Sequence, residues 1–178
     1  TPETLGLTVT KIWNDADDQD GVRPDSITVN LLANGKVVDT VTLDAAGKWK
    51  YEFAGLPKYK DGAELVYTVA EAAVDGYTPS IKGFEITNTH EPEKTSVSGA
   101  KIWADSNDQD GIRPDEITIR LYADGEEIKS VTVTEEDDWM FSFSGLDKYR
   151  DQGTEIVYTI TEDEVAEYTS EIDGFNVT

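Results

Sequence analysis

The two halves of this chain carry nearly the same sequence. Residues 11–35 and 101–125 are identical at 16 of 25 aligned positions, at an offset of 90. The match continues toward the carboxyl end, where one extra residue near Gln152 shifts the offset to 91. A repeat of this length predicts two homologous domains, each long enough to enclose its own core. We place them at residues 1–91 and 92–178, joined by a short charged segment that predicts a semi-stiff connection.

Within each repeat, apolar and polar residues alternate with a period of two, as in strands that bury one face. In the first repeat the alternating runs are residues 7–13, 27–31, 49–53, 67–71 and 84–88. Turn residues separate the runs, and Asn34-Gly35 between two of them is a strong hairpin signal. Six or seven short strands in about 85 residues predict a β-sandwich. We therefore expect an all-β chain of two tandem sandwiches, without helices.

The composition argues against several classes of partner. The 37 acidic and 15 basic residues leave a net charge of −22, spread along the chain. Such a surface repels nucleic acid and anionic lipid, and it favours a monomer. The absence of cysteine excludes disulfides and cysteine-ligated metals. No run of 18 apolar residues predicts membrane insertion, and Thr1–Leu5 is no signal peptide, so we expect a segment of a longer protein.

Three polar residues of the first repeat share a strand face with apolar neighbours. Lys11, Glu71 and Asn88 each follow an apolar residue two positions earlier, at 9, 69 and 86. If these faces point inward, one amine, one carboxyl and one carboxamide are buried. An isolated buried charge is costly, so each needs a polar partner. We therefore expect the three side chains to meet.

Two interpretations fit such a cluster. In the structural one, Lys11 and Glu71 form an ordinary ion pair near the Asn88 amide, or the lysine reaches solvent. In the reactive one, the desolvated lysine loses its proton more readily and attacks Asn88, while the buried glutamate supplies a proton to the amide carbonyl. Ammonia leaves, and an amide bond joins the first strand to the last. Closing that loop stabilises the domain by about 4–5 kcal/mol.

The motifs of the first repeat form an ordered set. They run T-K-I-W, D-Q-D-G-x-R-P-D, I-T-V-x-L-x-A-N-G, F-x-G-L-P-K-Y, Y-T-V-x-E, G-Y and I-T-N-T. This set resembles the Cna B-type domain of Gram-positive collagen adhesins and pilins, and the resemblance covers nearly the whole chain, twice. It implies an inverse immunoglobulin-like sandwich and an intramolecular isopeptide bond between Lys11 and Asn88, assisted by Glu71.

The resemblance also implies a role. Domains of this kind form the stalk or spacer of an extracellular surface protein anchored to the cell wall. The chain would then be no enzyme beyond its own single cross-linking event, and it would need no cofactor. The implied partners are neighbouring repeats of the same parent protein, with host extracellular matrix bound through other domains.

The second repeat departs from this pattern at its last strand. Lys101 and Glu162 match the lysine and glutamate of the first repeat, so Glu162 is the expected assisting residue. The position that matches Asn88 is 179, immediately after Thr178, and the acceptor is expected there. Asn176 has the opposite parity and is expected to point outward, which makes it a poor substitute.

Two other classes of function remain as alternatives. An adhesive module that binds host matrix protein or glycan directly needs an exposed apolar or aromatic patch, and the sequence shows no such run. A secreted acidic hydrolase needs paired inward carboxylates, whereas each repeat has one inward glutamate. The lone histidine, His90, lies at the linker and is not expected to be catalytic.

The acidic loops near residues 15–20 and 105–110 contain residue types that bind calcium. The spacing does not match an EF-hand, because the twelfth position would be Ile27, where that loop needs glutamate. We expect solvated loops without a metal, in which Arg23 and Arg113 pair with neighbouring acids. Weak calcium binding remains the alternative.

Overall fold

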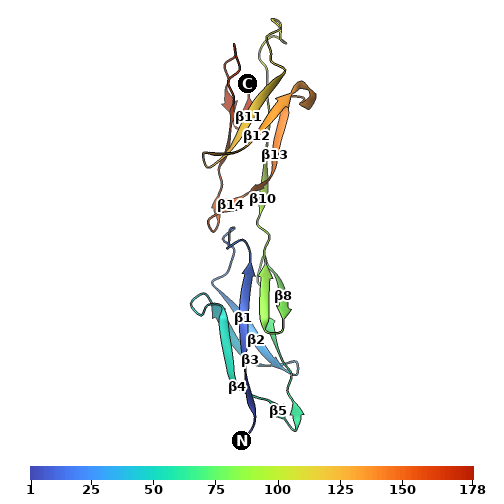
Figure 1. Ribbon diagram of the computed structural model, residues 1–178, viewed down its shortest axis with the longest axis vertical. Helices are drawn as coiled ribbons and strands as arrows, with labels where there is room; N and C mark the ends of the chain where they lie inside the picture. The colour runs from blue at the N-terminus through green and yellow to red at the C-terminus, as the bar shows by residue number, and fades with distance from the viewer. The chain divides into compact units, whose positions relative to one another are not determined.

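The computed structural model describes residues 1–178, and nearly all its regular structure is β (Figure 1). The chain divides into two compact units, one built mainly from Thr1–Pro92 and the other from Glu93–Arg150 and Thr154–Thr178. The predicted pair of β-sandwiches is confirmed. The one helical element is a single 3-10 turn, Glu135–Asp137. The chain has no helix long and apolar enough to span a bilayer.

The first unit contains two main sheets. One has the strand order β4-β1-β9-β8 and the other β3-β2-β7, and β5 pairs with β6 in a short ribbon. In Figure 1, β1 runs between β4 and β8, which belong to the same sheet. The strands are β1 (Thr4–Asn14), β2 (Ser26–Ala33), β3 (Lys36–Asp44), β4 (Lys50–Pro57), β5 (Tyr59–Lys60), β6 (Ala63–Glu64), β7 (Tyr67–Glu71), β8 (Thr78–Lys82) and β9 (Glu85–Thr89).

Strand β1 is the centre of the first sheet. It pairs antiparallel with β4 on one side and parallel with β9 on the other. The parallel register sets Lys11 opposite Ile86 and Trp13 opposite Asn88. The first and last strands of the repeat are therefore neighbours that run in the same direction.

The predicted hairpin connects β2 and β3. Asn34 and Gly35 form its turn with φ angles of 49° and 78°. Both angles lie in the left-handed region, where glycine and asparagine are the least strained residues. The Asn34 side chain also accepts a hydrogen bond from the backbone of Val66 at 3.0 Å.

The second unit repeats this plan with shorter pairing at its end. Its sheets have the orders β10-β13 and β12-β11-β16, with ribbons β14-β15 and β17-β18. An isolated parallel bridge joins Lys101 to Val177, as Lys11 pairs with Ile86 in the first unit. The strands are β10 (Lys94–Ala100), β11 (Glu116–Ala123), β12 (Glu126–Thr134), β13 (Met140–Asp147), β14 (Tyr149–Arg150), β15 (Thr154–Glu155), β16 (Tyr158–Glu162), β17 (Ile172–Asp173) and β18 (Asn176–Val177).

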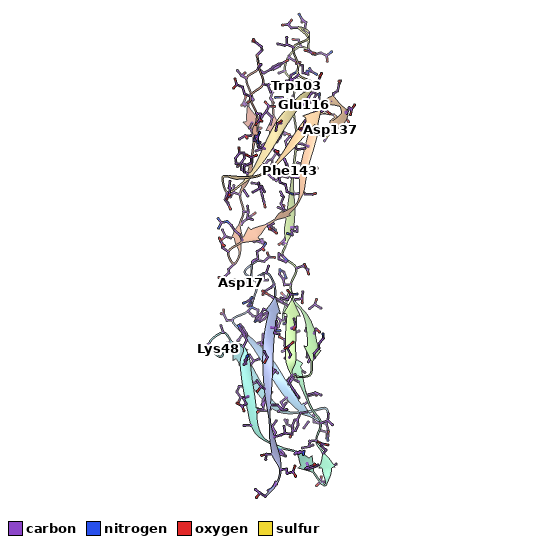
Figure 2. The ribbon with its side chains drawn as sticks, in the orientation of Figure 1. Asp17, Lys48, Trp103, Glu116, Asp137 and Phe143 are labelled. Carbon is purple, nitrogen blue, oxygen red and sulfur yellow. The ribbon has the colours of Figure 1, made fainter.

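Each unit encloses its own apolar core between its two main sheets. The alternating strand residues that face inward are almost fully buried, as Val9, Leu31 and Ile86 show in the first unit. In the second unit the side chains of Trp103 and Phe143 pack in the corresponding core (Figure 2). This burial is the main stabilising contribution, and it also fixes which residues share an inner face.

Candidate functional site

The structure brings Lys11, Glu71 and Asn88 together between the two sheets of the first unit. Lys11 extends from β1 and Asn88 from β9, while Glu71 comes from β7 in the opposite sheet. The Lys11 Nζ lies 2.9 Å from Glu71 Oε1, and Asn88 Nδ2 donates to the same oxygen at 3.0 Å. The three groups predicted from strand parity thus meet at a single carboxylate oxygen.

This cluster is shielded from water. The side chains of Lys11 and Glu71 are 0% and 3% exposed, and Asn88 is 0% exposed as a residue. Burial lowers the pKa of Lys11, because it penalises the charged ammonium, although the hydrogen bond and charge of Glu71 oppose the shift. The predicted alternative in which Lys11 reaches solvent is wrong.

The Asn88 amide is only partly satisfied. Its Oδ1 is buried and has no hydrogen-bond partner. A buried acceptor without a partner is uncommon in proteins and costs free energy. Turning the amide over about its last torsion would bring this oxygen, in place of Nδ2, toward Glu71, where a protonated carboxyl donates to it.

The second unit brings together the lysine and glutamate that correspond to Lys11 and Glu71. Lys101 Nζ lies 2.9 Å from Glu162 Oε2 and 3.1 Å from Oε1, and both side chains are 2% exposed. Asn176 is exposed, and its Oδ1 accepts a hydrogen bond from the Ala100 backbone at 3.1 Å. The structure therefore places Asn176 on the outer side of its strand, away from the buried pair, as its parity predicts.

The acidic loops are organised by arginine. In the first unit Arg23 donates from Nε and Nη2 to the two carboxylate oxygens of Asp15, at 3.0 and 2.6 Å. The same fork joins Arg113 to Asp105 at 3.0 and 2.7 Å. The predicted pairing of both arginines with neighbouring acids is confirmed. No group of three or more His, Cys, Asp or Glu side chains is arranged to hold a metal ion.

Two contacts of these loops were not predicted from the sequence. The hydroxyl of Tyr77 donates to Asp15 at 2.9 Å, and Tyr168 donates to Asp105 at the same distance. The one available signal was that the two tyrosines occupy matching positions in the repeats. His90, which the sequence left without a role, lies 2.8 Å from Asp20 through Nε2 and 2.9 Å from the Gly76 carbonyl through Nδ1.

The fold, the repeat and the buried cluster define a class of tandem β-sandwich domains whose first and last strands meet beside a buried lysine. The sequence matches the Cna protein B-type domain family over residues 7–89 and again over 97–178, and the chain belongs to that family. Members of this family are structural modules of adhesins rather than enzymes.

The chain is similar to the collagen adhesin of Staphylococcus aureus, with 43% identity over 176 residues. That match spans 98% of this chain but 15% of the adhesin, so the chain corresponds to a small part of its relative. A crystal structure of two B repeat units of the S. aureus collagen-binding protein is 42% identical, with a TM-score of 0.51 over 99% of this chain and 48% of that one. A single B repeat unit of the same protein is 41% identical over 98% of this chain and 97% of the other, with a TM-score of 0.49.

Proposed function

We propose that this chain is a stalk or spacer segment of an extracellular adhesin anchored to the cell wall, and that a Lys11–Asn88 isopeptide bond stabilises its first repeat. The convergence of an amine, a carboxyl and a carboxamide in a solvent-shielded site carries this proposal. The S. aureus relative supports the surface location, because its name is that of an adhesin. Each module corresponds to one repeat, with bounds at 1–91 and 92–178.

The proposed reaction follows from the positions of the three groups. The neutral Lys11 amine attacks the Asn88 side-chain carbon, while a protonated Glu71 donates to the amide oxygen and polarises the carbonyl. Glu71 then carries a proton from the attacking nitrogen to the departing nitrogen, and it recovers its own proton from the oxygen as the C=O bond re-forms. The Lys11 N–C bond forms, the Asn88 C–Nδ2 bond breaks, and one ammonia leaves. Glu71 ends in its starting state, so it acts as an acid and base within one turnover.

The position of the bond suits a domain that carries tension. It joins β1 to β9, the first and last strands of the repeat, which already lie side by side. Because the two strands are parallel, tension on the ends of the repeat slides them past each other and loads their hydrogen bonds together. A covalent bond between the strands blocks this sliding until a chemical bond breaks. The cross-link also restricts the unfolded chain, which raises stability. A module that transmits force between neighbouring repeats gains from both effects.

We assign spacing, and not matrix binding, to this segment. Its exposed apolar side chains are distributed over many strands and loops in both units. Single exposed apolar residues are normal on protein surfaces and do not define a binding patch. In this proposal its partners are the adjacent repeats of the parent protein, and other domains contact the host matrix.

Intact-mass measurement of the purified chain tests the cross-link. Loss of one ammonia lowers the mass by about 17 Da relative to the sequence. Peptide mapping is expected to recover a branched peptide that contains Lys11 and Asn88. A first repeat that keeps its full mass after folding would refute the proposed bond.

A further inference from the structure

The indole of Trp13 lies against the Lys11 amine, on a residue that pairs with Asn88. Trp13 is two residues after Lys11 on β1 and stands opposite Asn88 in the parallel register. Lys11 Nζ is 4.5 Å from the centre of the Trp13 ring. The ring is partly buried and packs against the core. Any displacement of this indole therefore changes how much water reaches the amine and the amide.

Residues of two loops outside the sheets contact Trp13. The guanidinium carbon of Arg23 lies 5.4 Å from the centre of the indole, and Tyr77 meets it edge-on at 5.0 Å. Both residues are held by Asp15, which is 2% exposed and accepts two hydrogen bonds from Arg23 and one from the Tyr77 hydroxyl. Asp15 thus fixes two of the groups that contact the indole.

A strained turn supplies another contact. Trp49 packs edge-on against Trp13 at 5.2 Å, and its φ of 58° lies in the left-handed region. That region is unfavourable for a bulky side chain, so its surroundings must hold it there. Lys48, in the same turn before β4 (Figure 2), has a φ of 56°. The turn therefore accepts backbone strain while its tryptophan packs on Trp13.

The second repeat builds the same arrangement with its own residues. Trp103 lies 4.6 Å from Lys101 Nζ and 5.2 Å from the Arg113 guanidinium carbon. It meets Trp139 at 5.2 Å and Tyr168 at 5.0 Å, both edge-on. Trp139 again has a positive φ, of 57°. The arrangement thus accompanies the buried lysine in both repeats, although surface residues around it differ.

We propose that Asp15, Arg23 and Tyr77 are positioning residues for isopeptide formation, which hold Trp13 as a cover over Lys11 and Asn88. This role rests on the proposed cross-link. A fixed cover keeps water away from the Lys11 amine. It also holds this amine near the Asn88 side-chain carbon, in an orientation suited to attack. It also suppresses a competing reaction, in which water attacks the same carbon, ammonia leaves, and Asn88 becomes aspartate with a gain of about 1 Da.

The test follows bond formation in time after brief cell-free synthesis, using intact mass. The variants are Arg23→Gln and Tyr77→Phe, which loosen the cover without altering Lys11, Glu71 or Asn88. We expect Arg23→Gln to slow the loss of 17 Da by about tenfold or more, because misplacement of reacting groups by about 1 Å costs up to a hundredfold. We also expect that in a fraction of the Arg23→Gln molecules Asn88 is hydrolysed to aspartate, with a gain of about 1 Da.

The dependence of the rate on pH separates positioning from general destabilisation. Glu71 is the ionisable group that hydrogen-bonds Lys11, and the Arg23 guanidinium carbon lies 5.4 Å from the centre of the Trp13 ring. Water that enters past a loosened Trp13 raises the pKa of Lys11 toward its ordinary value. A higher pH is then needed to reach the same fraction of neutral amine. The rate profile of Arg23→Gln is therefore expected to shift to higher pH.

Two controls make the outcome decisive. Arg113→Gln makes the same change in the second repeat and is expected to leave the rate unchanged. Leu31→Ala removes a fully buried core side chain of β2, which pairs in register with Val69 of β7, and tests whether lower stability alone slows the bond. Slowing by Leu31→Ala to the same extent, or wild-type rates and pH profiles in both cover variants, would overturn the positioning role. Full mass in the unsubstituted chain would instead overturn the cross-link itself, and this role with it.

Discussion

Lys11 occupies a position where an ordinary lysine is unfavourable. Its side chain is fully buried beside a carboxylate, and removing both charges from water costs several kcal/mol before their attraction offsets it. An apolar pair of similar volume often makes a domain equally stable or more so. A reactive role accounts for the buried lysine better than a stabilising one, because conversion of the amine to an amide removes the buried positive charge permanently.

Glu71→Gln separates the proton transfer by the glutamate from the space that its side chain fills in the core. The glutamine side chain has nearly the same shape, so the sandwich is expected to fold with Lys11 still buried. Glutamine does not transfer protons between the two nitrogens, and we expect the loss of 17 Da to disappear. Intact mass after prolonged incubation measures this directly. Glu162→Gln is the matched control and should leave the mass loss intact. Bond formation at the normal rate in Glu71→Gln would mean that desolvation of the amine is sufficient.

The last strand of the first repeat is held at its end by His90. Both imidazole nitrogens face acceptors, one the Asp20 carboxylate and the other the Gly76 carbonyl. A ring with two hydrogen-bonded acceptors is best satisfied when it is doubly protonated. The hydrogen bond to Asp20, followed by the one to Gly76, raises the pKa of His90 in the folded chain. The ring also stacks at a tilt on Tyr77, 5.4 Å between centres.

This contact makes the stability of the first repeat depend on pH. Because the folded pKa is raised, the contribution is fully present below the unfolded value of about 6.5 and is lost as pH rises through the folded pKa. We expect His90→Gln to cost up to about 1 kcal/mol near pH 5.5 and less near pH 8.5. Denaturant unfolding of the unsubstituted chain and of His90→Gln at the two pH values measures the difference in their free energy of unfolding. An equal cost at both values would contradict a charged His90.

The sequence predicted the direction of side chains in strands, but it predicted only some of the side-chain contacts in loops. Lys11, Glu71 and Asn88 were found because a strand alternates strictly between faces, so sequence parity determines burial. The same rule placed Asn176 on the outer face. The pairing of Tyr77 with Asp15 was missed because loop residues have no period that relates position to direction. The left-handed conformation of Trp49 was missed for a related reason, since only tertiary packing selects it.

The two repeats form a comparison within one molecule. They share the architecture, the buried lysine–glutamate pair and the tryptophan cover, and in the first repeat the Asn88 amide lies beside that pair. We therefore predict that Lys11 and Asn88 are cross-linked in the first repeat. Removing this bond by substitution measures what it contributes to the stability of that repeat.

Calorimetry of the intact chain measures that contribution. Closing the loop from Lys11 to Asn88 is expected to stabilise the first repeat by about 4–5 kcal/mol, which raises its melting temperature by about 20 °C or more. The double variant Lys11→Met/Glu71→Gln removes the bond and the buried charges together, so the upper of two transitions should fall by that amount. Lys101→Met/Glu162→Gln changes only a non-covalent pair and should shift the lower transition slightly. Similar shifts in the two double variants would show that the first repeat is held by packing alone.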